Sequence, residues 1–142
     1  MKLQVGLLSF VFLVVGRSHA AVCEGKNHSG VTALYLSQSI KPDSAAEQWV
    51  SDFREQIQGS DPYCLVSDKD KAVMVVNVVG MDADLSKNST AISIAIYTAK
   101  GSIFLDHWMY VAAKEILQSS SEKAFASLQK EIQELKRLRL IK

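Results

Sequence analysis

The spacing of apolar and polar side chains predicts three strands in the first half of the chain. Residues 31–40, VTALYLSQSI, alternate with the period of two that is typical of a β-strand. Residues 63–66 form a short apolar segment before a charged turn. The segment 72–79, AVMVVNVV, is rich in β-branched residues and apolar on both faces, with Asn77 as its only polar member. This last pattern predicts a strand covered on both sides at the centre of a sheet.

A hairpin is predicted after this strand. Residues 91–99 alternate, with three isoleucines on one face, and residues 103–111 alternate again. The sequence Lys100-Gly101-Ser102 between them is typical of a turn. We therefore expect two antiparallel strands joined by a glycine-containing turn.

Two helices are predicted from apolar residues spaced three and four apart. The first begins at Ser44, where Glu47 three residues later completes a capping-box sequence, and ends at Gly59. The second begins at Ser121, and its narrow apolar stripe consists of Phe125, Leu128, Ile132 and Leu135. This stripe is shorter than a coiled coil requires, so a helix lying across a sheet is the favoured interpretation.

The order of the predicted elements is therefore β-α-β-β-β-β-α. A strand–helix–strand crossover followed by a meander is typical of an α+β single domain. We expect a mixed sheet with both helices packed on one face.

The first twenty residues have the features of a secretory signal peptide. Lys2 is followed by an apolar run at 5–15, and Ser18-His19-Ala20 fits a signal-peptidase site. The run is too short for a membrane-spanning helix, which needs roughly 20 apolar residues. The residues before Cys23 do not fit a bacterial lipid-attachment site. These features predict a mature domain at residues 21–142, without an integral membrane anchor, in the periplasm or secreted.

The charge balance argues against binding to polyanions. The full chain has 16 basic and 15 acidic side chains, and loss of Lys2 and Arg17 with the leader leaves one acidic group in excess. Such a chain has no general attraction to nucleic acid or anionic membrane. We expect no nucleic-acid partner.

The two cysteines, Cys23 and Cys64, both lie in the predicted mature domain. An even number of cysteines in an exported protein favours a disulfide. Closing a loop of about 42 residues would stabilise the fold by roughly 4 kcal/mol. A reactive or metal-binding thiol pair would need a C-x-x-C spacing or a nearby histidine, and neither cysteine has one. No cofactor or metal site is predicted.

His107 is the strongest candidate for catalysis. A hydrolase would use it as a general base that activates a serine and is oriented by a carboxylate. Asp106 precedes it, but adjacent strand residues point to opposite faces, so this carboxylate is poorly placed to orient the ring. The sequence also has no G-x-S-x-G motif. A surface or edge histidine is the favoured interpretation.

The loop at residues 81–88 resembles the start of a calcium loop. Counted from Asp82, its sixth position is Lys87, where glycine is needed, and its twelfth is Ser93, where a bidentate glutamate is needed. A solvated turn is therefore favoured. Asn27 and Asn88 both begin N-glycosylation sequences, which matter only if the source is a eukaryote.

A candidate interaction surface consists of an aromatic pair and a basic helix end: Trp108, Tyr110, Lys136, Arg137 and Arg139. The aromatic pair shares its predicted strand face with Phe104, so this face is either covered by a helix or an exposed strip that binds a partner. The basic residues complement the helix dipole. They also suit an acidic partner or phospholipid head groups.

The pattern of hydrophobic residues over 31–138 resembles that of small bacterial envelope domains. The resemblance rests on the first helix, the sequence Tyr63-Cys64-Leu65-Val66, the charged turn, the valine-rich run at 72–76, the hairpin and the terminal helix. Similar patterns occur in the amino-terminal domain of TolB and in lipoprotein activators of penicillin-binding proteins. The resemblance implies a protein–protein adaptor fold without an active site.

Two hypotheses follow for the function. The first is a noncatalytic exported module that binds an envelope protein through the hairpin, an exposed sheet edge or the basic helix end. The second is a small secreted hydrolase or ligand-binding protein that uses His107 with a loop carboxylate. The sequence does not predict the oligomeric state.

Overall fold

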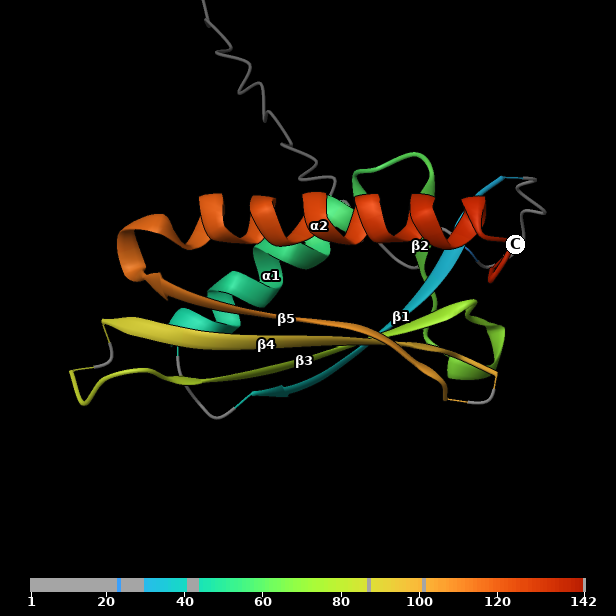
Figure 1. Cartoon of the computed structure of the whole chain (residues 1–142). Helices are drawn as coiled ribbons and strands as arrows, with labels where there is room; N and C mark the ends of the chain where they lie inside the picture. Colours follow the sequence, from blue (N-terminus) through green and yellow to red (C-terminus); the bar gives the residue numbers. More distant parts are fainter. Residues whose placement is uncertain (1–22, 24–29, 41–43, 87, 101, 142) are drawn as a thin grey trace, which may run out of the picture.

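The chain folds around a five-stranded mixed sheet with two helices on one face (Figure 1). The computed structural model describes residues 23, 30–40, 44–86, 88–100 and 102–141. In chain order, the elements are β1 (Thr32–Ile40), α1 (Ser44–Gln58), β2 (Tyr63–Leu65), the 3-10 turn η1 (Lys69–Lys71), β3 (Met74–Asp82), β4 (Ser89–Thr98), β5 (Phe104–Ala113), the 3-10 turn η2 (Lys114–Ile116) and α2 (Leu117–Arg137). This order confirms the predicted α+β single domain.

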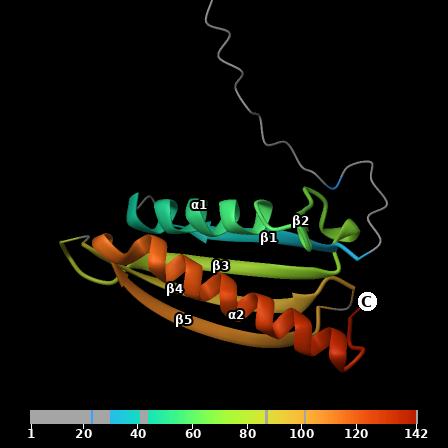
Figure 2. The ribbon, with the colours of Figure 1, turned by 90° about the horizontal axis from the view of Figure 1, so that it is seen from above.

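The sheet has the strand order β2-β1-β3-β4-β5. Strand β1 pairs in parallel with both β2 and β3, whereas β3, β4 and β5 form an antiparallel meander. Helices α1 and α2 lie side by side over the same face, α1 above β1 and β3 and α2 above β4 and β5 (Figure 2). Both helices therefore pack on one face, as the sequence predicts.

The core lies between the helices and this covered face of the sheet. Its largest fully buried side chains come from both layers: Trp49, Phe53, Ile57, Leu128 and Ile132 from the helices, and Leu34, Met74, Val76, Val78, Ile92, Ile94 and Ile96 from the sheet. Gly80 allows close approach, because a Cβ there would lie 2.8 Å from the Cβ of Ala46 on α1. The bare backbone of β3 thus lets α1 sit directly on the sheet.

The opposite face of β3 differs from the prediction of a strand covered on both sides. No helix covers this second face within the described chain, and Asn77 and Val79 are half-buried there. Val75 is 7% exposed all the same. It has a paired strand on each side, with Tyr35 on β1 and Tyr97 on β4 at the same level. A central strand can therefore be apolar on both faces when its lateral neighbours shield the open face.

Two local features of the second half differ from the sequence interpretation. Helix α2 begins at Leu117, four positions before the predicted start, and Ser121 is fully buried inside it. Ser121 does not cap the helix, because its hydroxyl accepts a hydrogen bond from Gln56 Nε2 on α1 and donates to the carbonyl of Gln118. A register shift between β4 and β5 also places Phe104 opposite Tyr97. Phe104 therefore does not share a face with Trp108.

A disulfide joins Cys23 to Cys64 on the edge strand β2, with 5.8 Å between the Cα atoms. Cys64 pairs with Ala33 at the start of β1, so the segment before β1 and the edge of the sheet lie close together. This bond confirms the prediction from the cysteine count. The predicted leader at residues 1–20 lies outside the described residues. Among the described helices, none is both long and apolar enough to cross a bilayer.

Candidate functional surface

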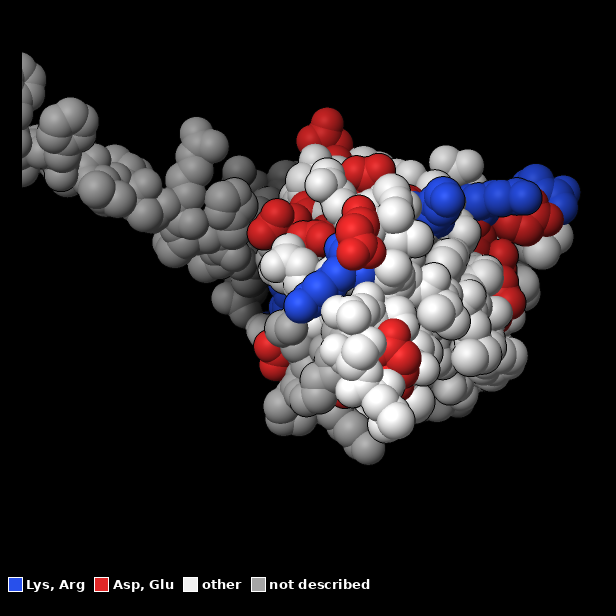
Figure 3. All heavy atoms as spheres, turned by 90° about the vertical axis from the view of Figure 1, so that its left-hand side faces the viewer, with Lys and Arg blue, Asp and Glu red and all other residues white. Residues whose placement is uncertain are grey.

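The open face of the sheet is the main surface that no helix covers. It is defined here by the outward-pointing residues of β1, β3, β4 and β5, none of which is Asp, Glu, Lys or Arg: Tyr35, Ser37, Ser39, Val75, Asn77, Val79, Met81, Ala91, Ser93, Ala95, Tyr97, Phe104, His107, Met109 and Val111. Figure 3 views the molecule from one end of the sheet and shows few charged side chains on this lower side. The exposed large apolar side chains of this face, Met81, Phe104, Met109 and Val111, favour a role in binding a partner.

Strand β5 forms one edge of this face. Within the described residues it pairs on one side only, with β4, over most of its ten residues. Its side chains on the open face are strongly exposed, and Met109 and Val111 are each 68% accessible. Natural sheet edges are usually protected by lysine, proline or short length. β5 has none of these features; a register shift and the Asp106 carboxylate, which also protect an edge, lie in its first half.

A side chain protects the backbone in the first half of β5. The Asp106 carboxylate accepts a hydrogen bond of 2.7 Å from the backbone NH of His107. The segment from Met109 to Val111 has no comparable side-chain contact to its backbone among the described residues. The second half of β5 is therefore the open half of the edge.

His107 also lies on the open face, where its Nε2 is 2.8 Å from Ser93 Oγ on β4. A serine and a histidine within hydrogen-bond distance are two of the three members of a catalytic triad. Asp106 does not complete it, because its carboxylate contacts the backbone of His107, as the strand alternation predicts. The described residues supply no other carboxylate contact to the ring. The geometry favours a cross-strand pair on a surface.

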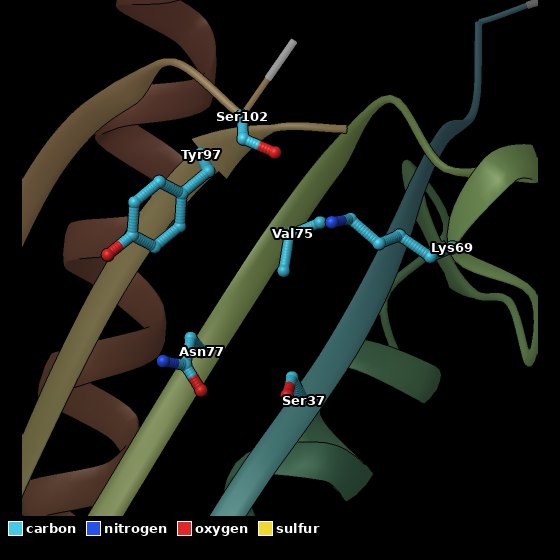
Figure 4. A pocket seen from close by; sticks show the side chains of 6 residues that line it. All are labelled: Ser37, Lys69, Val75, Asn77, Tyr97 and Ser102. Atoms are coloured by element: carbon cyan, nitrogen blue, oxygen red, sulfur yellow. The ribbon is translucent and has the colours of Figure 1, made fainter. Parts of the chain in front are cut away.

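The same face contains a hollow of about 310 Å³ near the β4–β5 turn. Six side chains line it: Ser37, Lys69, Val75, Asn77, Tyr97 and Ser102 (Figure 4). Lys69 reaches in from η1 on one side, and Tyr97 and Ser102 stand on the other. The sequence interpretation missed this hollow, although Asn77, as the only polar residue of its strand, was a signal for it.

The predicted aromatic pair lies on the covered face. Trp108 and Tyr110 are half-buried and pack against the core, and the Tyr110 hydroxyl donates a 3.1 Å hydrogen bond to Ser127 Oγ on α2. The ring of Tyr110 lies 6.3 Å from that of Trp49. Of the two alternatives raised by the sequence, a face covered by a helix is the one observed. The role of this pair in an interaction surface stays a prediction.

The basic residues lie at the end of α2. Arg137 is exposed and forms an ion pair with Glu134, one turn earlier. The hydrogen bond between the two side chains is the main cause that lowers the pKa of Glu134 and raises the pKa of Arg137. Lys136 is half-buried, and Arg139 is exposed just beyond the helix. Their role in binding stays a prediction.

Arg139 has an unusual backbone conformation, with φ of 58°. Its NH donates to the carbonyl of Lys136, and the NH of Leu140 donates to the carbonyl of Leu135. These two bonds form a Schellman motif, in which glycine is the usual residue at the left-handed position. An arginine is therefore held there at a conformational cost.

The loop between β3 and β4 is organised by Asp84. Its carboxylate accepts hydrogen bonds from Ser86 Oγ, Ser89 Oγ and the backbone NH of Asn88. These contacts describe a hydrogen-bonded turn. Within the described residues, no group of three or more His, Cys, Asp or Glu side chains is placed to hold a metal ion.

Comparison with known proteins shows similarity in fold alone. No family model and no curated protein matches the sequence. TolB from Acinetobacter baumannii is similar with a TM-score of 0.58 and 6% identity, over 73% of this chain and 29% of that chain. PelC from Paraburkholderia phytofirmans, solved as a dodecamer, has a TM-score of 0.46 and 9% identity, over 66% of this chain and 85% of that chain. Uncharacterized lipoprotein B from Nitrosomonas europaea has a TM-score of 0.33 and 13% identity, over 77% and 81% of the two chains.

The similarity to TolB confirms, for the fold, the resemblance noted in the sequence. This chain spans less than a third of the length of TolB, so the match concerns a part of that protein. No family is assigned. The disulfide is typical of proteins that fold outside the cytoplasm.

Proposed function

We propose that this chain is a noncatalytic protein-interaction module of the bacterial periplasm, and that it binds an extended segment of an envelope protein along β5. The observation that carries the proposal is the unprotected second half of this edge strand, with Met109 and Val111 exposed beside it. An extended peptide that adds to a sheet edge gains main-chain hydrogen bonds, and alternate side chains give specificity.

The side chains on β5 suit this mode of binding. Met109 and Val111 are two residues apart and point to the same face, beside the small residues Ser93 and Ala91 of β4. Each apolar side chain that becomes fully buried contributes roughly 1.5–3 kcal/mol. A strand that pairs with β5 would place its own alternate side chains beside Met109 and Val111 on the open face.

The test is affinity capture from envelope extract with the purified, immobilised protein. We expect one stoichiometric partner, lost from the Met109→Lys and Val111→Lys variants because a lysine would be desolvated in the complex. Gln133→Lys is the matched control, since Gln133 is exposed on α2, away from β5. Retention of the partner by both β5 variants would overturn the proposed binding edge.

A second candidate function rests on the 2.8 Å contact between Ser93 Oγ and His107 Nε2. A small hydrolase would use the imidazole to remove the serine proton. The test is a screen of periplasmic esters and amides with the wild-type protein and with His107→Ala. Turnover that this substitution abolishes, without a change in the melting curve, would replace the noncatalytic proposal.

A further inference from the structure

The hollow on the open face has the size and lining of a small ligand site. Its volume of about 310 Å³ lies at the lower end of the roughly 300–1,000 Å³ that is typical of such sites. Val75 and Asn77 on β3 and Ser37 on β1 form the floor, with Lys69 on one side and Ser102 and Tyr97 on the other; the Ser102 hydroxyl points toward Lys69, and the Tyr97 ring points away from it (Figure 4). Three strands and two turns thus contribute to one concave surface.

The polar groups that line the hollow are unused by the protein itself. The hydroxyls of Ser37, Tyr97 and Ser102 and the amide of Asn77 have no hydrogen-bond partner within the described part of the chain. The ammonium of Lys69 has no carboxylate within 4.0 Å in the same part of the chain. By contrast, Ser93 and His107 on the same face contact each other. The hollow therefore concentrates free donors and acceptors.

Asn77 is hard to explain by folding alone. Asparagine is disfavoured in strands, and this residue sits in the middle of the central strand, where every other position from Met74 to Val79 is apolar. Its amide stabilises no turn, cap or neighbouring side chain in the described structure. Residues that break a local rule without a structural gain are typical of functional sites.

Ser102 is the second residue with an unfavourable local geometry in this hollow. Its φ of 51° is in the left-handed region, which few residues other than glycine and asparagine adopt readily. Figure 4 shows its hydroxyl pointing toward the hollow. The turn thus presents a hydroxyl beside the ring of Tyr97.

The side chains that line the hollow indicate which class of ligand it would bind. Among the residues that the structure describes, one ammonium and no carboxylate line the hollow, which suits an anion with a single charge and disfavours a zwitterionic amino acid, whose own ammonium would be unpaired. The hydroxyls and the amide suit a ligand that carries several hydroxyl groups. The Tyr97 ring, which packs in an edge contact with Phe104 at 5.7 Å between ring centroids, offers an apolar surface that suits the C–H face of a sugar ring. We propose that the hollow binds a carboxylate-bearing sugar residue, with its carboxylate at Lys69 and its hydroxyls at Asn77, Ser37 and Ser102.

The test is an NMR titration of the purified protein with D-glucuronic acid and N-acetylneuraminic acid, with D-glucose as the neutral comparison. We expect saturable shifts at Asn77 and Tyr97 with at least one acid. Glucose should bind at least about tenfold more weakly, because it lacks the charge-assisted bond to Lys69. No saturable shift at these residues with either acid at 50-fold excess over about 1 mM protein would overturn the proposal.

Variants separate the site from nonspecific effects. Lys69→Ala and Asn77→Val should each weaken binding of the acid by about tenfold or more. Lys71→Ala is the matched control, because Lys71 lies on the same turn as Lys69 but does not line the hollow. Valine at 77 suits a central strand, so this variant should retain its fold and melt no lower than wild type. Unchanged affinity in both variants would show that the acid binds elsewhere and would overturn the site.

Discussion

The indole Nε1 of Trp49 on α1 donates a 3.1 Å hydrogen bond to Ser120 Oγ on α2. Both residues are buried, and the bond joins the two helices above the sheet. Ser120→Ala should lower the free energy of unfolding by about 1–3 kcal/mol, because it leaves a buried N–H without a partner. Urea denaturation measures the loss. In a Trp49→Phe background, the same substitution should have little effect, and equal losses in both backgrounds would show that this bond contributes nothing.

The contact between Gly80 and α1 gives a second prediction. Gly80→Ala should destabilise the protein by about 1–3 kcal/mol through overpacking, since the new methyl group would lie 2.8 Å from the Ala46 Cβ and 3.2 Å from Ile92 Cδ1. Thermal denaturation checks this value. Adding Ala46→Gly should make the double variant more stable than the sum of the two single losses predicts. Simple additivity would place the strain elsewhere.

Removal of the disulfide should lower the free energy of unfolding, and chemical reduction of the bond should have the same effect. Replacing both Cys23 and Cys64 by serine should lower the free energy of unfolding by about 4 kcal/mol, given the sequence separation of 41 residues. Dithiothreitol should cause the same loss in the wild type and none in the double variant. A reductant effect on the variant would mean that the loss does not come from this bond.

The left-handed residue at the end of α2 predicts a stabilising substitution. Arg139→Gly should raise the free energy of unfolding by about 1 kcal/mol, because glycine adopts a φ of 58° without strain. Leu138→Gly is the control: its φ is −79°, so glycine there should lower stability. If Arg139 contributes to binding, the more stable glycine variant would bind its partner more weakly.

Glu131 on α2 predicts a pH effect. Burial is the largest cause that raises the pKa of its carboxyl above the ordinary 4.5, and the nearby Asp106 and Glu134 carboxylates raise it further. The folded protein thus holds this proton more tightly than the unfolded chain. The ionised Glu131 carboxylate therefore lowers the free energy of unfolding at neutral pH, and this loss is relieved as the pH falls through the raised pKa. Glu131→Gln should stabilise the protein at pH 7 by roughly 0.5 kcal/mol or less, with little gain at pH 3. Urea denaturation at both pH values tests this, and an equal gain at both would exclude an electrostatic cause.

The repeating patterns in the sequence were sufficient to predict the layers. The alternation in β1, β4 and β5 and the stripe Trp49–Phe53–Ile57 each depend on near neighbours in the chain, so they can be read without knowing the fold. The disulfide was also predictable, because both cysteines lie after the predicted leader and their even number favours a bond. The strands, the helix and the disulfide each depend on residues close together in the sequence or on a single pair of residues, so the sequence was sufficient to predict them.

The open face could not be predicted in the same way. The β1–α1–β2 crossover is expected to be right-handed, but which alternate residues of each strand face the helices depends on packing between elements and on the path of α2, neither of which has a local signal. The register shift near Phe104 is equally invisible in the alternation, although it moves that ring to the other face. The ligand hollow depends on both, since Lys69, Asn77 and Tyr97 come together only across paired strands.

The position of β1 between β2 and β3 affects the order of folding. β1 is first in sequence among the strands, yet both of its partners follow only after α1 has been made. The β3–β4–β5 meander has short connections and can form early, whereas pairing of β1 needs closure of a long loop, which is slow. A helix-disrupting substitution in α1 should therefore delay the pairing of β1 with β2 and β3 and leave formation of the meander unchanged, and oxidation of Cys23 with Cys64 would report when β1 has paired with β2.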